Sequence, residues 1–222
     1  VLAMASSVYL ILSWSRERER NRILRKNQYK IKLEYLKNQI QPHFFFNTLN
    51  NLYALSLEAS DKVPNVIIKL SHLMEYVLYE IEGTKFVPLI KELDYIHNYI
   101  EIEKLRFENA TVFINLESNI DQVSVPPLLL ISLIENAFKH GGINNKDLKI
   151  KINCKVSSQN TLDFEIINNF ALSQHEKSKK GIGLTNTKER LNLIFKNDYQ
   201  LNHQVKFNFY IIRLQIPISN ED

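Results

Sequence analysis

The chain has 222 residues, of which 45% are hydrophobic and 23% charged, and its formal net charge is +4. These values are ordinary for a folded protein with one large domain or two small ones. The charge is too mild and too widely spread to indicate direct binding of nucleic acid. The single cysteine, Cys154, excludes an internal disulfide and fits a reducing compartment. It lies in an alternating apolar and polar run, which indicates a packing residue of a half-buried strand.

The chain opens with an apolar run that ends at Trp14 and is followed by a basic cluster between Arg16 and Lys26. About 20 apolar residues are needed to span a bilayer as a helix, so this run is too short alone. We interpret residues 1–15 as the end of a truncated transmembrane helix, with the basic cluster on the cytoplasmic side. A secretory signal is the alternative, but its basic residues would precede the apolar run.

Residues 16–83 predict a helical hairpin. No glycine or proline occurs between Arg16 and Pro42, and the first helix is expected to continue to about Glu58. A second helix with an apolar stripe follows the break at Pro64 and ends at Gly83. Two such stripes cannot both be buried within one hairpin. Dimerisation into a four-helix bundle would bury them.

The first helix contains the stretch Gln39–Asn51, in which His43 directly follows Pro42. Imidazole can be neutral, nucleophilic and proton-carrying near neutral pH. Proline inside a helix removes a backbone hydrogen bond and favours a bend, which suits an exposed functional group. The alternative is that Pro42 starts a helix and His43 is an ordinary, partly buried histidine. This stretch alone does not decide between the two.

The second half of the chain predicts an α+β sandwich with its helices on one face. Helices are expected at 89–107, 128–140 and 184–196, and strands at 112–116, 148–156, 161–168 and 205–216. The alternation in the last segment changes phase between Phe209 and Tyr210, which predicts a bulge or two separate strands. The boundary between hairpin and sandwich should fall near residues 83–88.

The nearly all-apolar helix 128–140 ends in a polar group. Asn136, Lys139 and His140 share one helix face because they are three and four residues apart. An amide oxygen beside a lysine can hold a Mg²⁺ ion and a phosphate together. The alternative is an ordinary surface pair between Glu135 and Lys139, which leaves the polar end of so apolar a helix unexplained.

Four of the five glycines are Gly141, Gly142, Gly181 and Gly183. The last two precede a helix, and glycine there lets the backbone and the free N–H groups of a helix N-terminus approach a phosphate. The lysines of the preceding loop would face a triphosphate as a mobile lid, or form an ordinary solvated charge run.

Four ordered motifs, LKNQIQPHFFFNTLNNL, VPLIKELDYIHNYIEIEKLRF, VPPLLLISLIENAFKHG and GIGLTNTKERL, resemble the LytS/YehU-type sensor histidine kinases. The resemblance runs from Leu36 to Pro217. It implies a dimerising hairpin with the phosphoacceptor histidine, followed by a GHKL-type ATP-binding α/β sandwich. The implied domains are residues 1–15, 16–83 and 84–218.

The resemblance also implies the roles of individual residues. His43 would be phosphorylated from ATP, Asn47 would match a position used in dephosphorylation, and Asn136 would bind Mg²⁺. Glu135 is a candidate general base through its proximity to Asn136. The remaining nucleotide contacts implied are Lys139, His140, Asn168, Gly181, Gly183, Leu184 and Asn186.

The family resemblance implies a bacterial homodimer anchored in the cytoplasmic membrane, with its catalytic part in the cytoplasm. The phosphoryl group would pass to an aspartate of a response regulator with a LytTR DNA-binding domain. Two departures from related kinases are present. Asn168 stands where an aspartate normally binds adenine and both glycines of that motif are missing, which predicts weaker ATP binding. Phe44 occupies the position where many histidine kinases have an acid.

Two rival functions follow from the same residues. The altered adenine motif would suit a degenerate kinase that acts as a dimeric signalling scaffold. A protein-serine kinase of the anti-sigma type has a similar ENAxxHG-like box, but that class lacks the PHFFFN helix.

Overall fold

The computed structural model describes residues 14–25, 42–107, 109–117, 120, 123–141, 147–157, 160–169 and 182–218. By its contacts the chain divides into two compact units, Val1–Gln41 and Pro42–Asp222. In the first unit, residues 14–25 are helical. Most of the predicted transmembrane segment, and residues 26–41 of the predicted first helix, lie outside the described residues. Within the described ranges, no helix is both long and apolar enough to cross a bilayer.

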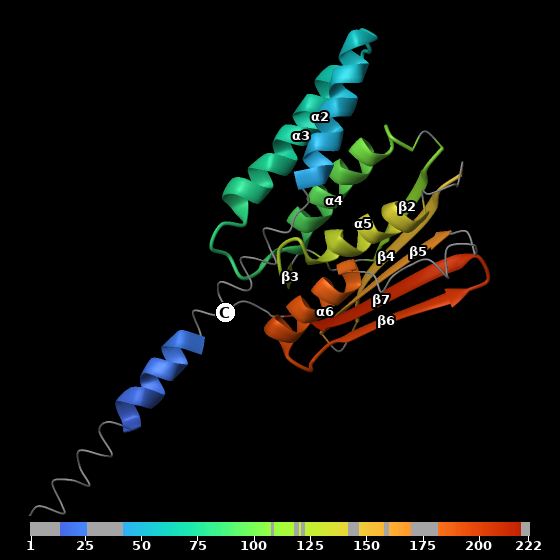
Figure 1. The fold of residues 1–222 in the computed structure, drawn as a ribbon. Helices are drawn as coiled ribbons and strands as arrows, with labels where there is room; N and C mark the ends of the chain where they lie inside the picture. The colour runs from blue at the N-terminus through green and yellow to red at the C-terminus, as the bar shows by residue number, and fades with distance from the viewer. Residues whose placement is uncertain are drawn as a thin grey trace, which may run out of the picture. The chain divides into compact units, whose positions relative to one another are not determined.

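The second unit begins with the predicted hairpin, formed by α2 (Pro42–Leu57) and α3 (Val63–Glu75) (Figure 1). The loop between them lies at the predicted break, and Pro64 occupies the first turn of α3, where proline is tolerated. α3 continues into a π-helical turn, η1 (Tyr76–Glu80), in which the Ile81 N–H bonds the Tyr76 carbonyl 3.2 Å away. The sequence does not predict this turn, because no residue type is specific to it. π-Helical turns occur frequently at functional sites.

A five-stranded sheet follows the hairpin, with strand order β2-β4-β5-β7-β6. β2 pairs with β4 in parallel and the other neighbours are antiparallel. The strands are β2 (Thr111–Leu116), β4 (Lys149–Ser157), β5 (Thr161–Asn169), β6 (Gln200–Lys206) and β7 (Phe209–Pro217). A separate ribbon joins β1 (Val87–Pro88) to β3 (Ser124–Val125).

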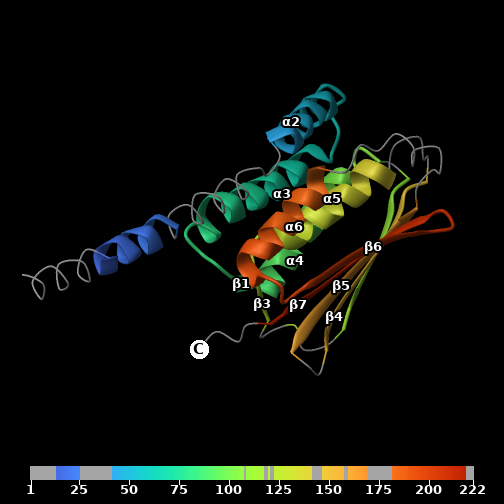
Figure 2. The ribbon, with the colours of Figure 1, turned by 60° about the horizontal axis from the view of Figure 1, so that its bottom comes forward.

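Helices cover one face of the sheet (Figure 2). They are α4 (Leu89–Glu103), α5 (Leu129–Gly141) and α6 (Ile182–Phe195). Alternate residues of the central strands point into the core beneath them, among them Ile152, Phe164 and Leu214, each fully buried. Cys154 belongs to the same layer, and burial raises the pKa of its thiol to about 12. The predicted α+β class, with helices on one face and a helical hairpin before the sheet, is therefore confirmed.

The phase change near Phe209 separates two strands. β6 and β7 are joined by a turn in which Phe207 has φ +55°. β6 begins at Gln200, whereas the sequence predicted a start near Val205. This start was wrong because β6 is an edge strand with mostly exposed side chains, so its sequence carries little apolar alternation.

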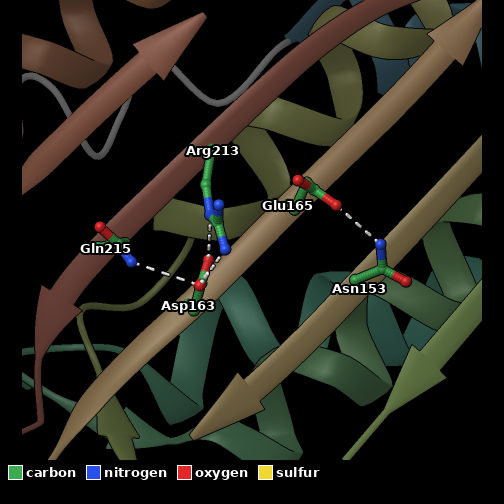
Figure 3. Close-up of polar contacts among 5 residues, drawn as sticks. All are labelled: Asn153, Asp163, Glu165, Arg213 and Gln215. Carbon is green, nitrogen blue, oxygen red and sulfur yellow. Dashed lines mark hydrogen bonds and ion pairs between the residues drawn. The ribbon is translucent and has the colours of Figure 1, made fainter. Parts of the chain in front are cut away.

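The face of the sheet away from the helices carries polar side chains that bond across strands (Figure 3). Arg213 of β7 donates to both carboxylate oxygens of Asp163 on β5, at 2.9 and 2.7 Å, and Gln215 donates to the same group at 3.3 Å. Asn153 of β4 donates to Glu165 at 2.9 Å. Such pairs between neighbouring strands stabilise a sheet on its solvent side.

Candidate functional site

α5 places Asn136 in the interior of the sandwich. The helix follows Pro126-Pro127, and nine of its thirteen residues are buried, which fixes its position against the sheet and the other helices. The Asn136 side chain is 9% exposed, Lys139 is exposed and His140 is half-buried. Burial lowers the pKa of His140, and the charge of Lys139 adds to this shift. Both effects favour the neutral form of His140.

Asn136 lies against the first turn of α6. A Cβ atom added to Gly183 would come within 3.2 Å of the Asn136 Oδ1 atom. Glycine at this position therefore lets the start of α6 approach the amide of α5 closely. The structure brings together two of the residues that the sequence assigned to nucleotide binding, although they are 47 positions apart.

The end of α5 meets the end of β5. A Cβ atom on Gly141 would lie 2.5 Å from Leu148 Cδ1, 3.0 Å from the Asn169 carbonyl and 3.1 Å from Asn168 Nδ2. A side chain at Gly141 would require the Leu148 side chain to move and would crowd the Asn169 carbonyl. Glycine thus eases the close approach of the end of α5 to Asn168.

The Asn168 amide is buried, at 1% exposure, and only part of its hydrogen-bonding capacity is used. Its Nδ2 donates to the Asn169 carbonyl at 3.1 Å, whereas Oδ1 has no hydrogen-bond partner in the described part of the chain. The Asn169 side chain holds the start of β4, accepting from Lys149 N–H at 2.8 Å and donating to the Asp147 carbonyl at 2.7 Å. A buried acceptor without a donor is costly. Asn168 Oδ1 therefore suits a ligand that brings a donor.

Polar contacts fix α6 along α5. The hydroxyls of Ser132 and Thr187 lie 3.1 Å apart, and Thr187 also donates to the Gly183 carbonyl at 3.0 Å. Three residues on, Arg190 reaches the carbonyls that precede α5. Gly183, Thr187 and Arg190 lie on one face of α6. This face contacts Asn136 at its start and then forms hydrogen bonds with α5 and with the turn before it.

The start of α2 packs on α4, which in turn contacts α5. Phe44 is 3% exposed, and its ring centroid lies 4.7 Å from that of Tyr99 on α4. The Tyr99 ring in turn lies 6.0 Å from Phe138 of α5. The His43 backbone belongs to the first turn of α2, and its side chain lies outside the described atoms. Phe44 occupies the position where many histidine kinases have an acid, and here it is a packing residue.

The other predicted site residues that the structure describes lie on α2, α5 and α6. Leu184 and Asn186 are half-buried on α6, Glu135 is half-buried on α5, and Asn47 is half-buried on α2. Gly181 and the lysines of the preceding loop lie outside the described residues. The catalytic and binding roles assigned to all of them remain predictions.

Sequence reasoning missed a buried polar cluster behind the site. Glu92 of α4 is fully buried, and Arg190 of α6 is 8% exposed. A signal for Glu92 was present, because it lies three residues from Leu89 and four from Ile96, at apolar spacing on α4. A charged residue on the buried face of a helix must find hydrogen-bond partners.

Comparisons with known proteins agree with the motifs. A family model described as histidine kinase matches residues 31–111. The sensor protein LytS of Oceanobacillus iheyensis is 29% identical over 207 residues, which cover 85% of this chain and 35% of LytS. The sensor histidine kinase BtsS of Escherichia coli K12 is 29% identical over 192 residues, with 85% and 34% covered. The chain thus spans about a third of the length of the curated relatives it matches.

Similar solved structures include two histidine kinase domains. The match to the histidine kinase domain of the Erythrobacter litoralis blue-light activated histidine kinase covers 87% of this chain and 94% of that domain's chain. The identity is 15% and the TM-score is 0.48. The catalytic domain of histidine kinase ThkA covers 61% and 97%, at 19% identity and a TM-score of 0.47.

Proposed function

Because the chain is similar to LytS and BtsS and matches a histidine kinase family model, we propose that it is a LytS-type sensor histidine kinase that transfers the γ-phosphoryl group of ATP to His43. The group then passes to an aspartate of a response regulator, in keeping with a two-component system. The observation that carries the proposal is the meeting of Asn136, Gly183, Gly141 and Asn168 at one end of α5. Three motifs far apart in the sequence supply these residues.

The residues present fit an adenine nucleotide. Asn168 Oδ1 is a buried acceptor without a donor, which suits the exocyclic amino group of adenine. The close approach of Gly183 to Asn136 leaves the N-terminus of α6 beside an amide oxygen, and helix N-termini bind phosphates. Lys139, at the exposed end of α5, supplies a positive charge for the phosphates.

Asn136 would hold Mg²⁺, which neutralises phosphate charge and polarises the γ-phosphoryl group. A neutral imidazole nitrogen of His43 attacks phosphorus, a P–N bond forms, the bond to the bridging oxygen breaks, and ADP leaves. The imidazole proton passes to a base, for which Glu135 is the predicted candidate. Positioning and charge neutralisation supply most of the catalysis in phosphoryl transfer.

The wider setting is also part of the proposal. The exposed apolar residues of α2 and α3 support a homodimer in which two hairpins form a four-helix bundle. The apolar run before Arg16 supports a membrane anchor upstream, with the catalytic part in the cytoplasm. A response regulator with a LytTR DNA-binding domain is the proposed partner.

Incubation of the purified chain with γ-labelled ATP and Mg²⁺ tests the reaction. We expect an acid-labile, base-stable label, as phosphohistidine gives. His43→Gln should abolish the label while titration with a fluorescent ATP analogue still shows saturable, Mg²⁺-dependent binding. A label that survives in His43→Gln would place the phosphoacceptor elsewhere. An unlabelled wild-type chain without saturable nucleotide binding would contradict the kinase proposal.

A further inference from the structure

A buried hydrogen-bond network connects the end of the hairpin to the beginning of α5. The Tyr76 hydroxyl, in the π-helical turn η1, donates to Glu92 Oε1 at 2.7 Å. The Leu128 backbone N–H donates to the same oxygen. Tyr76 is 4% exposed and Glu92 is fully buried, so neither bond competes with bulk water. Hydrogen bonds in such surroundings are strong, and their loss is expensive.

Arg190 holds the same turn from the opposite side. Its Nη1 donates to the Leu128 carbonyl at 3.1 Å, and its Nη2 donates to the Pro127 carbonyl. Leu128 has φ +59°, a conformation that costs about 1 kcal/mol or more for a residue with a side chain. The strained turn that starts α5 is therefore fixed by Glu92 at its N–H and by Arg190 at its carbonyls.

The position of Arg190 also sets the nucleotide site. Gly183, Thr187 and Arg190 lie on the face of α6 that contacts α5, where Gly183 approaches Asn136 and Thr187 lies 3.1 Å from Ser132. A helix is stiff over two turns. Movement of Arg190 along α5 would therefore shift Gly183 relative to Asn136.

The network leaves two charged groups incompletely bonded. Glu92 Oε2 and Arg190 Nε are buried and have no hydrogen-bond partner among the described residues. A direct pair between the two side chains would satisfy both atoms, but Arg190 would then have to leave the carbonyls of the turn. A buried polar atom without a partner costs free energy, and this favours an arrangement in which the two atoms bond to each other.

We propose that Tyr76, Glu92 and Arg190 are positioning residues that couple the end of the phosphoacceptor hairpin to nucleotide affinity. While Tyr76 donates to Glu92, the carboxylate stays on the Leu128 turn and Arg190 stays on its carbonyls. When η1 moves and Tyr76 withdraws, Glu92 pairs directly with Arg190 and α6 shifts along α5. The consequence for ATP rests on the proposed function, whereas the coupling itself does not.

The first experiment is a double-mutant cycle in the full chain. Tyr76→Phe removes the donor and keeps the ring, which packs on Tyr95 with centroids 5.1 Å apart. We expect Tyr76→Phe and Arg190→Lys each to weaken Mg²⁺-dependent binding of the ATP analogue about five- to tenfold. The double variant should bind no more than about twofold weaker than the weaker single variant, because both changes break one network.

The matched control is Tyr95→Phe, which removes a buried phenol hydroxyl from the adjacent ring but none of the bonds to Glu92. It should change nucleotide affinity less than about twofold. In Tyr76→Phe the rate of His43 labelling at saturating ATP should stay within about twofold of wild type. Only the ATP concentration that gives the half-maximal rate should rise. Multiplying effects in the double variant, or an equal loss in Tyr95→Phe, would overturn the proposal.

The second experiment needs no nucleotide. Amide hydrogen exchange of nucleotide-free Tyr76→Phe should be faster in the first turn of α5 and along α6, and unchanged in α2. Unchanged exchange in both α5 and α6 would refute the coupling, whatever the kinase assays give. A wild-type chain that binds no nucleotide would refute the proposed function, while the exchange measurement would still decide the coupling.

Discussion

At the scale of single residues, the Asn168 amide performs two tasks that a carboxylate could not. Its Nδ2 donates to the Asn169 carbonyl at 3.1 Å, and its Oδ1 remains a buried acceptor. An ionised aspartate has only acceptors, so one of its oxygens would face the Asn169 carbonyl. The departure from the family's aspartate thus has a local reason, and it keeps the acceptor that adenine would need.

Asn168→Leu replaces the amide with an apolar side chain that has the same branching and the same number of heavy atoms. We expect ATP affinity to fall about tenfold, because the amino group of adenine loses its partner, and the preference for ATP over GTP to disappear. Competition of ATP and of GTP with the fluorescent analogue measures both affinities and therefore the preference. Asn153→Leu, on the opposite face of the sheet, is the control and should bind like wild type. Retained discrimination in Asn168→Leu would show that adenine is recognised elsewhere.

At the scale of elements, periodicity predicted the positions of most helices and strands because their faces differ sharply in polarity. α5 was expected at 128–140 and is found at Leu129–Gly141, and β5 was expected at 161–168 and is found at Thr161–Asn169. The π-helical turn was not predicted because no residue type is specific to it, and the ribbon of β1 and β3 was not predicted because it depends on backbone pairing between distant residues. Glu92 and Arg190 were missed for a related reason: their partners are mostly backbone atoms, which every sequence contains.

The candidate site was predictable only in part. The motifs named Asn136, Asn168 and Gly183, but not that Gly183 would approach Asn136 or that Gly141 would leave no room for a side chain. Both facts depend on how α5 sits against α6 and β5, which requires the packed structure. The packing role of Phe44 was equally hidden, because its partners Tyr99 and Phe138 belong to two other helices.

The outer face of the sheet makes stability depend on pH. Burial alone would raise the pKa of Asp163, but the hydrogen bonds and charge of Arg213 outweigh it, so the pKa is lowered. A lowered folded-state pKa stabilises the fold above the unfolded value, about 4, and this stabilisation is lost as pH falls through the folded value.

Arg213→Ala should reduce the free energy of unfolding at pH 7 by about 1 kcal/mol or less, since the Arg213 side chain is half exposed. The difference from wild type should shrink toward zero below pH 4, where Asp163 becomes protonated. Urea unfolding across this range measures it. Phe207→Ala, at the exposed turn between β6 and β7, should show no such pH dependence. A difference that stays constant with pH would mean that Arg213 acts by packing alone.

At the scale of the whole molecule, the hairpin leaves apolar side chains exposed on both helices. On α2, Phe46, Leu49, Tyr53 and Leu57 are 50–71% exposed and recur at helical spacing. On α3, Ile67, Ile68, Met74, Leu78 and Tyr79 of its π-helical extension are 45–75% exposed. A stripe of this kind marks an interaction surface. The inner residues Val66, Leu70 and Leu73 are buried instead.

Tyr53→Glu combined with Leu57→Glu should convert the expected dimer into a monomer, because two charges would be buried in the bundle. Sedimentation velocity at micromolar concentration would show half the wild-type mass. Phe207→Glu, which alters an 82% exposed aromatic far from the hairpin in the fold, should stay dimeric. A monomeric wild-type chain, or a dimeric double variant, would contradict assembly through the hairpin.

The two sides of α2 have separate tasks. Phe44 and Thr48 are buried and lie on one side of the helix, whereas the exposed stripe from Phe46 to Leu57 lies on the other. A second chain could therefore join the stripe without displacing Phe44 from Tyr99. α2 would then contact both a second chain and the helices α4 and α5 of its own chain. A rotation of α2 imposed at the dimer interface would therefore reach α4 and α5 while the dimer stays intact. The signal would then be a rotation within a dimer that stays assembled, so its speed need not depend on protein concentration.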